Sequence, residues 1–204
     1  MKKTSIFLAS LALLSASCAK EDLKEMSQNQ DTITIKADVP ATDSKTTISD
    51  NGDKTWSVLW TADDAISVNG QSSNSISLSD DRKSAEFTLP VVDAPYKAIY
   101  PASSAASAET LTVPATQNYV EGSIDPSSAI MLAYSETANQ ALAFHHAMAY
   151  LKINVQGTTD TDNIRSIRVS GNNNETMHGE FNLDFSDAPS MEAAEPAANN
   201  SIIP

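Results

Sequence analysis

Alternation of apolar and polar residues with a period of two is the feature that most limits the fold of this 204-residue chain. Ile33, Ile35, Ala37 and Val39 alternate with polar residues, and Pro40 follows them. Because successive side chains of a strand point to opposite faces, this pattern predicts a strand with one buried face. Similar segments recur at roughly ten-residue spacing, separated by Gly, Pro, Asn and Asp, and no adequate helical stripe interrupts them. An all-β antiparallel sandwich is therefore predicted.

The later strands are expected where the same alternation returns between turn residues. Asn51-Gly52 and Asn69-Gly70 can supply the positive φ angles of tight hairpins, and Asp80-Asp81-Arg82 marks a further turn. Residues 32–186 are predicted to form one β domain, and 187–204, rich in Ala, Glu, Pro and Asn, to form a linker or disordered tail. The expected strands are 56–60, 66–68, 76–78, 85–89, 96–100, 111–113, 129–134, 142–146, 150–155, 164–169 and 177–185.

The first 17 residues have the pattern of a secretory signal peptide. Two lysines precede an apolar stretch at 6–14, and Ser15-Ala16-Ser17 follow it. The stretch is far shorter than the ~20 residues of a membrane span. Cys18, the single cysteine, comes next and resembles the lipidated cysteine of the bacterial lipoprotein lipobox, although Ser15 replaces the usual Leu. Lipidation of Cys18 is expected; the alternative is an ordinary signal peptide with an incidental cysteine.

Residues 18–31 are polar and are predicted to form a flexible acidic tether. Ala19-Lys20-Glu21-Asp22 resembles the signal that directs lipoproteins of Bacteroides-type bacteria to the outer face of the outer membrane. The expected location is therefore the cell surface, with the lipid as anchor. The alternative is that these residues are only a solvated tether.

The net charge argues against nucleic acid as a partner. The chain carries 26 Asp and Glu against 13 Lys and Arg, a formal charge of −13. Binding to phosphates needs clustered cations, which this composition does not provide. Strong acidity instead favours solubility.

The three histidines give little support for a metal site. His145 and His146 are adjacent, so on a strand they point to opposite faces and cannot readily share one ion. His178 is the remaining histidine, and a packed or hydrogen-bonded imidazole is the simpler interpretation. No metal and no cofactor are predicted.

Acidic residues are concentrated in predicted turns. The groups at 50–53 and 160–163 lack the Gly and Glu positions of a calcium-binding EF-hand loop, and turn chemistry accounts for both. Asp63-Asp64 and Asp80-Asp81 are interpreted as solvated turns. No nucleophile elbow, phosphate-binding loop or glycine fingerprint is present, so no enzymatic activity is predicted.

Two tryptophans allow a binding interpretation and a structural one. Trp56 and Trp60 share a face with Val58, which favours a core face over an exposed platform that stacks on sugars. The predicted large core residues are Trp56, Trp60, Phe87, Tyr96, Phe144, Ile153 and Phe181.

Five segments in order resemble the fimbrillin family of Bacteroides-type bacteria, over about 33–185. The first is similar to the family's W-x-x-G/D-D-x-I-x-V pattern, and a lipobox precedes the series. The segments are KTWSVLWTADDAISV (54–68), YKAIYP (96–101), VPATQ (113–117), MLAY (131–134) and LAFHHAMAYLKI (142–153).

The resemblance implies a fimbrial subunit or adhesin with a transthyretin-like antiparallel Greek-key β-sandwich. In polymerising members a protease removes the first strand, and a strand of another subunit refills the groove. Here the removable strand carries Ile33, Ile35, Ala37 and Val39. A trypsin-like cut after Lys45 or Lys54 would release it, and the resemblance does not choose between them. The implied partners are other fimbrial subunits, the outer membrane and a host surface ligand.

The chain departs from the family in one respect. Family members normally carry a second β domain that donates a strand, and this sequence ends at Pro204 soon after the predicted linker. We therefore expect either a truncated product or a one-domain relative. The competing function is a stand-alone surface lipoprotein that binds glycans or host proteins.

Overall fold

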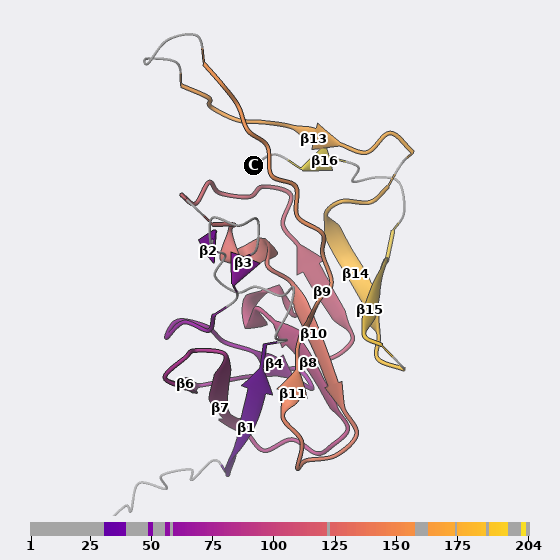
Figure 1. The fold of residues 1–204 in the computed structure, drawn as a ribbon. Coiled ribbons are helices and arrows are strands. Elements are labelled where there is room, and N and C mark those ends of the chain that lie inside the picture. The colour runs from indigo at the N-terminus through magenta and orange to yellow at the C-terminus, as the bar shows by residue number, and fades with distance from the viewer. Residues whose placement is uncertain are drawn as a thin grey trace, which may run out of the picture.

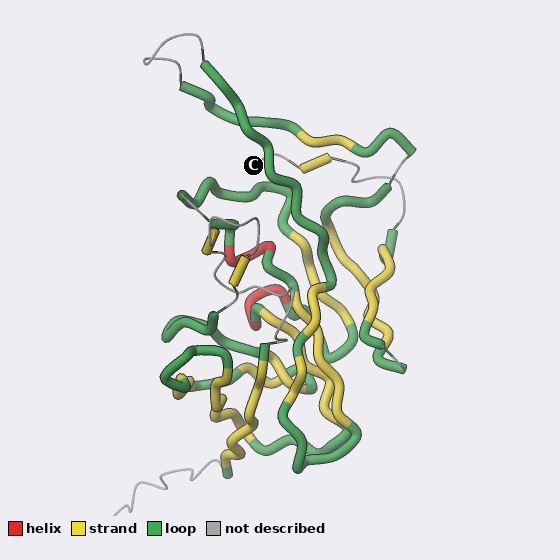
Figure 2. The backbone as a smooth tube through the Cα atoms, in the orientation of Figure 1, coloured by secondary structure: helices red, strands yellow, loops and turns green. Residues whose placement is uncertain are grey.

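The regular secondary structure of the protein, described here from a computed structural model, is mostly β-strand, in several antiparallel sheets with almost no helix (Figures 1 and 2). In the part of the chain that the structure describes, the helical elements are two single turns, η1 (Ala102–Ser104) and η2 (Pro126–Ser128). No helix among these residues is long and apolar enough to cross a membrane. The described residues are 31–39, 49–50, 56–57, 59–121, 123–157, 163–173, 175–186, 188–195 and 201–202.

The all-β prediction is confirmed, and most strands lie where the alternation placed them. The strands are β1 (Thr32–Asp38), β2 (Ser49–Asp50), β3 (Trp56–Ser57), β4 (Ser67–Val68), β5 (Gln71–Ser72), β6 (Ser75–Leu78), β7 (Ser84–Pro90), β8 (Tyr96–Tyr100), β9 (Thr110–Val113), β10 (Met131–Ser135), β11 (Leu142–Ala143), β12 (His145–His146), β13 (Val169–Ser170), β14 (Gly179–Asp184), β15 (Ser190–Ala193) and β16 (Ser201–Ile202).

Three sheets form the main body. One has four strands in the order β11-β1-β7-β6, a second has five in the order β12-β10-β8-β4-β5, and a third has three in the order β15-β14-β9. In Figure 1 the five-stranded sheet lies between β1 on one side and β14 and β15 on the other. Two further pairs, β2 with β3 and β13 with β16, complete the described strands.

The β4–β5 hairpin shows how a local signal specifies a turn. Asn69 has φ 50° and Gly70 has φ 80°, so both central residues of the two-residue loop have positive φ. Asn and Gly are the residues that adopt this conformation most readily, which is why the pair predicted the hairpin.

The inner strands β8 and β10 of the five-stranded sheet are buried on both faces. Along β8, Ala98 and Tyr100 belong to one apolar cluster and Ile99 to a second; on β10, Met131 and Leu132 divide in the same way. The first cluster also contains side chains of β1 and β7, and the second contains side chains of β9 and β14. Burial on both faces explains why β8 and β10 have nearly continuous apolar sequences whereas β1 alternates.

The residues beyond 187 require a correction. Ser190–Ala193 form β15, which pairs with β14 from Phe181↔Ala193 to Asp184↔Ser190 and does not act as a linker. Met191 and Ala193 pack against the second apolar cluster. Composition predicted a tail because four residues are too few to show a clear alternation.

The predicted core is largely confirmed. Trp60, Phe87, Tyr96, Phe144 and Phe181 are all buried. The side chain of Trp56 lies outside the described residues.

The predicted burial of Ile153 is wrong, because 43% of its surface is exposed. Residues 150–155 form no strand, and of 164–169 only Val169 belongs to one. Alternation shows only that a segment can be half-buried; apart from Val169, which pairs with Ile202 of β16, no described strand supplies a partner for these segments.

Candidate functional site

β1 occupies an internal position of the four-stranded sheet, between β7 and β11. It pairs with β7 antiparallel along its whole length, from Thr32↔Pro90 to Asp38↔Ser84. On the other side it pairs with β11 in parallel, at Ala37↔Leu142 and Asp38↔Ala143. Removing β1 would therefore open a gap between two strands.

The register gives each residue of β1 a defined role. Val39 N–H donates to Lys83 O at 2.9 Å, and Val91 N–H donates to Asp31 O at 3.0 Å. In an antiparallel ladder these bonds alternate, so the odd-numbered residues of β1 form the hydrogen-bonded pairs with β7. The backbone N–H and C=O groups of the even-numbered residues point towards β11, consistent with Phe144 N–H donating to Asp38 O at 3.2 Å.

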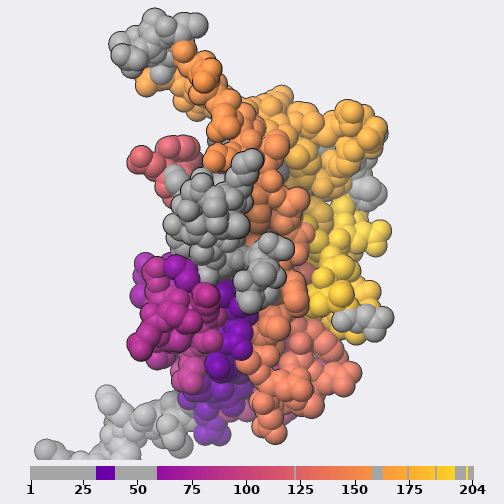
Figure 3. All heavy atoms as spheres, viewed as in Figure 1, coloured from indigo at the N-terminus to yellow at the C-terminus, as the bar shows by residue number. Residues whose placement is uncertain are grey.

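The same odd-numbered residues point into the core. Ile35, Ala37 and Val39 are 4%, 0% and 8% exposed, and Ile33 is half-buried against the same cluster. The opposite face, with exposed Thr32, Thr34 and Lys36, lies at the surface, where Figure 3 shows the indigo strand between its neighbours. β1 is thus held by its ladder and by one apolar face.

An aromatic cluster belongs to the core that receives β1. Trp60 is fully buried and makes edge-to-face contacts with three rings, with centroids 5.1 Å from Phe87, 5.5 Å from Tyr100 and 5.6 Å from Phe144. Aromatic pairs prefer this geometry. Trp60 Nε1 has no hydrogen-bond partner among the described residues. Its burial means that Trp60 cannot stack on a sugar, as the core interpretation predicted.

A half-buried carboxylate lies at the edge of this cluster. Asp64 Oδ1 accepts a hydrogen bond from Tyr100 Oη at 2.7 Å, and Oδ2 accepts one from Thr61 N–H at 2.7 Å. Burial raises the pKa of Asp64 above its usual 3.8, although both hydrogen bonds oppose the shift. Burial, reinforced by the Asp64 charge, raises the pKa of Tyr100 well above its usual range.

The prediction that Asp63-Asp64 form a solvated turn is therefore wrong for Asp64. Its neighbour Asp63 is exposed, as are Asp80 and Asp81 in the turn before β7. Sequence reasoning missed Asp64 because its partner Tyr100 lies 36 residues away.

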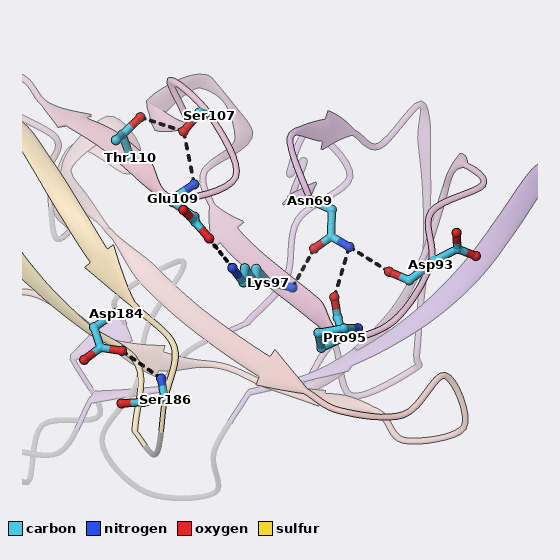
Figure 4. A network of polar contacts seen from close by, with 9 residues as sticks. All are labelled: Asn69, Asp93, Pro95, Lys97, Ser107, Glu109, Thr110, Asp184 and Ser186. Carbon is cyan, nitrogen blue, oxygen red and sulfur yellow. Dashed lines mark hydrogen bonds and ion pairs between the residues drawn. The ribbon is translucent and has the colours of Figure 1, made fainter.

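A polar network links the β4–β5 turn, the β7–β8 connection and the residues before β9 (Figure 4). The Asn69 amide Nδ2 donates to Asp93 O at 2.8 Å and Pro95 O at 3.0 Å, while its Oδ1 accepts from Lys97 N–H at 2.8 Å. Lys97 Nζ also forms an ion pair with Glu109. These contacts hold the β4–β5 turn against the β7–β8 connection, and they carry no reacting group.

The predicted processing and lipidation residues lie outside the described part of the chain. These are Cys18, Lys45 and Lys54. Cleavage after Lys45 and cleavage after Lys54 would separate different strands. Lys45 falls between β1 and β2, whereas Lys54 falls between β2 and β3, which pair at Ser49↔Ser57 and Asp50↔Trp56.

Among the described residues, the histidines do not form a cluster with other metal ligands. No group of three or more His, Cys, Asp or Glu that could hold an ion occurs within the described ranges. His146 packs edge-to-face on Tyr150, with a ring separation of 5.2 Å, and its Nδ1 lies 3.2 Å from Tyr150 Oη. His145 is exposed on the neighbouring position.

Comparisons of this chain with protein-family models, with curated proteins and with solved structures found no significant match.

Proposed function

We propose that this chain is a surface-exposed lipoprotein that acts as a structural fimbrial subunit or adhesin and is assembled by donor-strand exchange. The fold proposed with it is a transthyretin-like Greek-key sandwich. The observation that supports the proposal best is the placement of β1, a strand near the start of the described chain that is internal to its sheet. A strand in this position can leave without unthreading any other strand.

The energetics of β1 suit an exchangeable strand. Its loss uncovers the core beneath Ile33, Ile35, Ala37 and Val39, at about 0.8–3 kcal/mol for each side chain. It also leaves the facing edges of β7 and β11 without their ladder. An incoming strand with alternating apolar residues restores both contributions, which is the physical basis of strand addition.

The anchor in this proposal is Cys18, acylated and held in the outer membrane. Each buried methylene contributes about 0.8 kcal/mol, so several acyl chains give durable attachment. The partners are other subunits that supply the strand, and a host surface ligand contacted by the assembled fimbria. No catalytic group has a part in this function.

The two candidate cleavage sites would leave different products. A cut after Lys45 would release β1 alone, whereas a cut after Lys54 would also detach β2 from β3. Substituting Lys45→Gln or Lys54→Gln separately, followed by limited trypsin digestion and mass spectrometry, identifies the site that yields the acceptor form.

The decisive experiment is to trim the protein and refill it. A peptide of residues 31–39 is added to the trimmed and the intact protein, and a peptide with Ser at positions 33, 35, 37 and 39 serves as the control. We expect the native peptide to bind only the trimmed form and to restore its melting temperature. Full stability of the trimmed form without peptide, or equal rescue by the Ser peptide, would contradict donor-strand exchange.

The anchor is tested separately. Cys18→Ala expressed in a host with a lipoprotein pathway should incorporate no labelled palmitate and should leave the membrane fraction, whereas the unchanged chain should be labelled and sediment with membranes. Membrane retention of the variant, with an unlabelled parent protein, would refute lipidation at this residue.

A further inference from the structure

Residues 150–157, called here the apolar segment, expose alternate large side chains. Leu151, Ile153 and Val155 are 72%, 43% and 52% exposed. Figure 3 shows this part of the chain, in orange, leaving the main body towards the top of the view. Exposed apolar residues that follow one another on one face of an extended segment are typical of an interaction site, whereas scattered single residues are not.

The backbone of the apolar segment is unpaired at the same residues. Leu151, Ile153 and Val155 make no hydrogen bond with the part of the chain that the structure describes. β1 has the same alternation but exchanges hydrogen bonds with β7 along its length. An extended backbone with free N–H and C=O groups is a template for another strand.

A shallow cavity of about 180 Å³ lies beside the segment. Its wall is mainly apolar and includes Leu151 and Ile153, together with Val169 from the returning chain and Ile124 and Met148 from the body. The cavity can accept an apolar side chain of a strand that pairs with the segment.

The charged residues near the apolar segment determine which kind of partner strand would pair with it favourably. The returning chain, residues 163–170, exposes Arg165 and Arg168, which form no ion pair with described residues. Over residues 145–170 three cations, Lys152, Arg165 and Arg168, outnumber Asp160 and Asp162, which both lie outside the described residues, although the whole chain has a formal charge of −13. Opposite charge across a pairing edge stabilises it and like charge opposes it.

We propose that the apolar segment is a docking edge for a β-strand of another protein, one that alternates apolar and acidic side chains. Backbone hydrogen bonds to 151, 153 and 155 provide the pairing, the cavity accepts one apolar side chain, and Arg165 and Arg168 favour acidic residues between them. This edge is distinct from the place of β1 and is available while β1 remains in its sheet. It therefore does not depend on strand exchange at β1.

The test uses the protein with β1 still in place, not trimmed by protease, and labelled octapeptides. One peptide alternates Val and Glu, a second alternates Val and Lys, and a third has the Val-Glu sequence with a central Pro. Fluorescence anisotropy should give binding of the Val-Glu peptide at least about tenfold tighter than that of either control, weakening as salt rises. Equal binding of all three peptides, or no binding of the first, overturns the proposal.

Variants then locate the interaction. Leu151→Ser with Val155→Ser removes exposed apolar surface, and Ile153→Pro removes one unpaired N–H; each should weaken Val-Glu binding about tenfold or more. Val91, 50% exposed at a different site, provides the matched control Val91→Ser, which should bind normally. Circular dichroism confirms that each variant is folded.

Self-association is the remaining outcome to measure. The proposal expects a monomer by sedimentation when no peptide is added. A dimer that the Leu151→Ser, Val155→Ser variant abolishes would identify a second copy as the occupant and would overturn the assignment to another protein. Normal peptide binding by both variants of the apolar segment would overturn the location of the edge.

Discussion

β1 and the apolar segment 150–157 have the same kind of sequence and opposite environments. In β1, Ile35 is 4% exposed and its strand is paired on both sides; in the apolar segment, Ile153 is 43% exposed and its backbone is unpaired. Both segments place apolar residues at every second position. The difference therefore comes from the neighbours that the fold supplies.

The comparison separates two properties that alternation is often taken to imply together. A period of two shows that a strand could bury one face, but burial requires a second layer, and pairing requires an adjacent edge. β1 obtains its ladder from β7, and its cluster includes Tyr100 and Met131 of the five-stranded sheet. The apolar segment has neither within the described chain.

The largest expected effect distinguishes the two backbones. Ile35→Pro should destabilise the protein by about 3 kcal/mol or more, because it removes a ladder hydrogen bond and most of a buried side chain. Ile153→Pro should cost less than about 1 kcal/mol, since that N–H has no partner to lose. Urea unfolding measures both, and similar losses would mean that the two segments are equally structured.

Side-chain truncation gives the next largest difference. Ile35→Ala should cost about 2–4 kcal/mol, because it leaves a cavity in the core. Ile153→Ala should change the free energy of unfolding by no more than about 1 kcal/mol, since much of that side chain is already in water. A loss above 2 kcal/mol at Ile153 would place it in a core and would remove the basis for the docking edge.

A hydroxyl deletion examines the outer face of β1. Ser84 Oγ donates to Asp38 Oδ1 at 2.6 Å, across the β1–β7 pair. Ser84→Ala should therefore cost about 1 kcal/mol, whereas Ser166→Ala, at an exposed position outside the described strands, should be almost neutral. Equal effects in thermal unfolding would show that this hydrogen bond does not hold β1.

The smallest expected effect is a pH dependence of the protein's stability, caused by the Asp64 carboxylate at the edge of the cluster that packs against β1. Because burial raises the pKa of Asp64 in the folded state above its usual 3.8, the folded protein binds that proton more tightly. The stabilisation from this group is fully present below the usual value and is lost as the pH rises through the folded pKa. As the pH falls towards 3.8, the free energy of unfolding of the unchanged protein should rise relative to that of the Asp64→Asn variant. A difference between the two proteins that stays constant with pH would contradict this.

Much of the fold could be predicted because its signals are local. Asn69-Gly70 specified a hairpin, β1 was bounded correctly by its alternation, and the burial of Trp60 followed from its place beside apolar neighbours at even spacing. Three features could not be predicted in this way. They are the parallel pairing of β1 with β11, the hydrogen bond from Tyr100 to Asp64, and the strand β15.

The candidate site shows the same division. Ile33, Ile35, Ala37 and Val39 were identified as one face of a strand from spacing alone, because side-chain direction in a strand depends only on position along the chain. The internal place of that strand depends on β7 and β11, and Leu142 of β11 lies about a hundred residues further along the sequence. No local pattern carries that information.

The sequence by itself determined the period of the strands, the conformation of at least one turn, the acidic charge and the pattern that surrounds Cys18, since each depends on residues close together in the chain. The tertiary structure alone decided which alternating segment is buried. β1 gained a ladder and a core, whereas 150–157 kept its apolar side chains in water. The physical reason is that hydrogen-bond partners and covering layers come from distant strands, so equal patterns can have unequal environments.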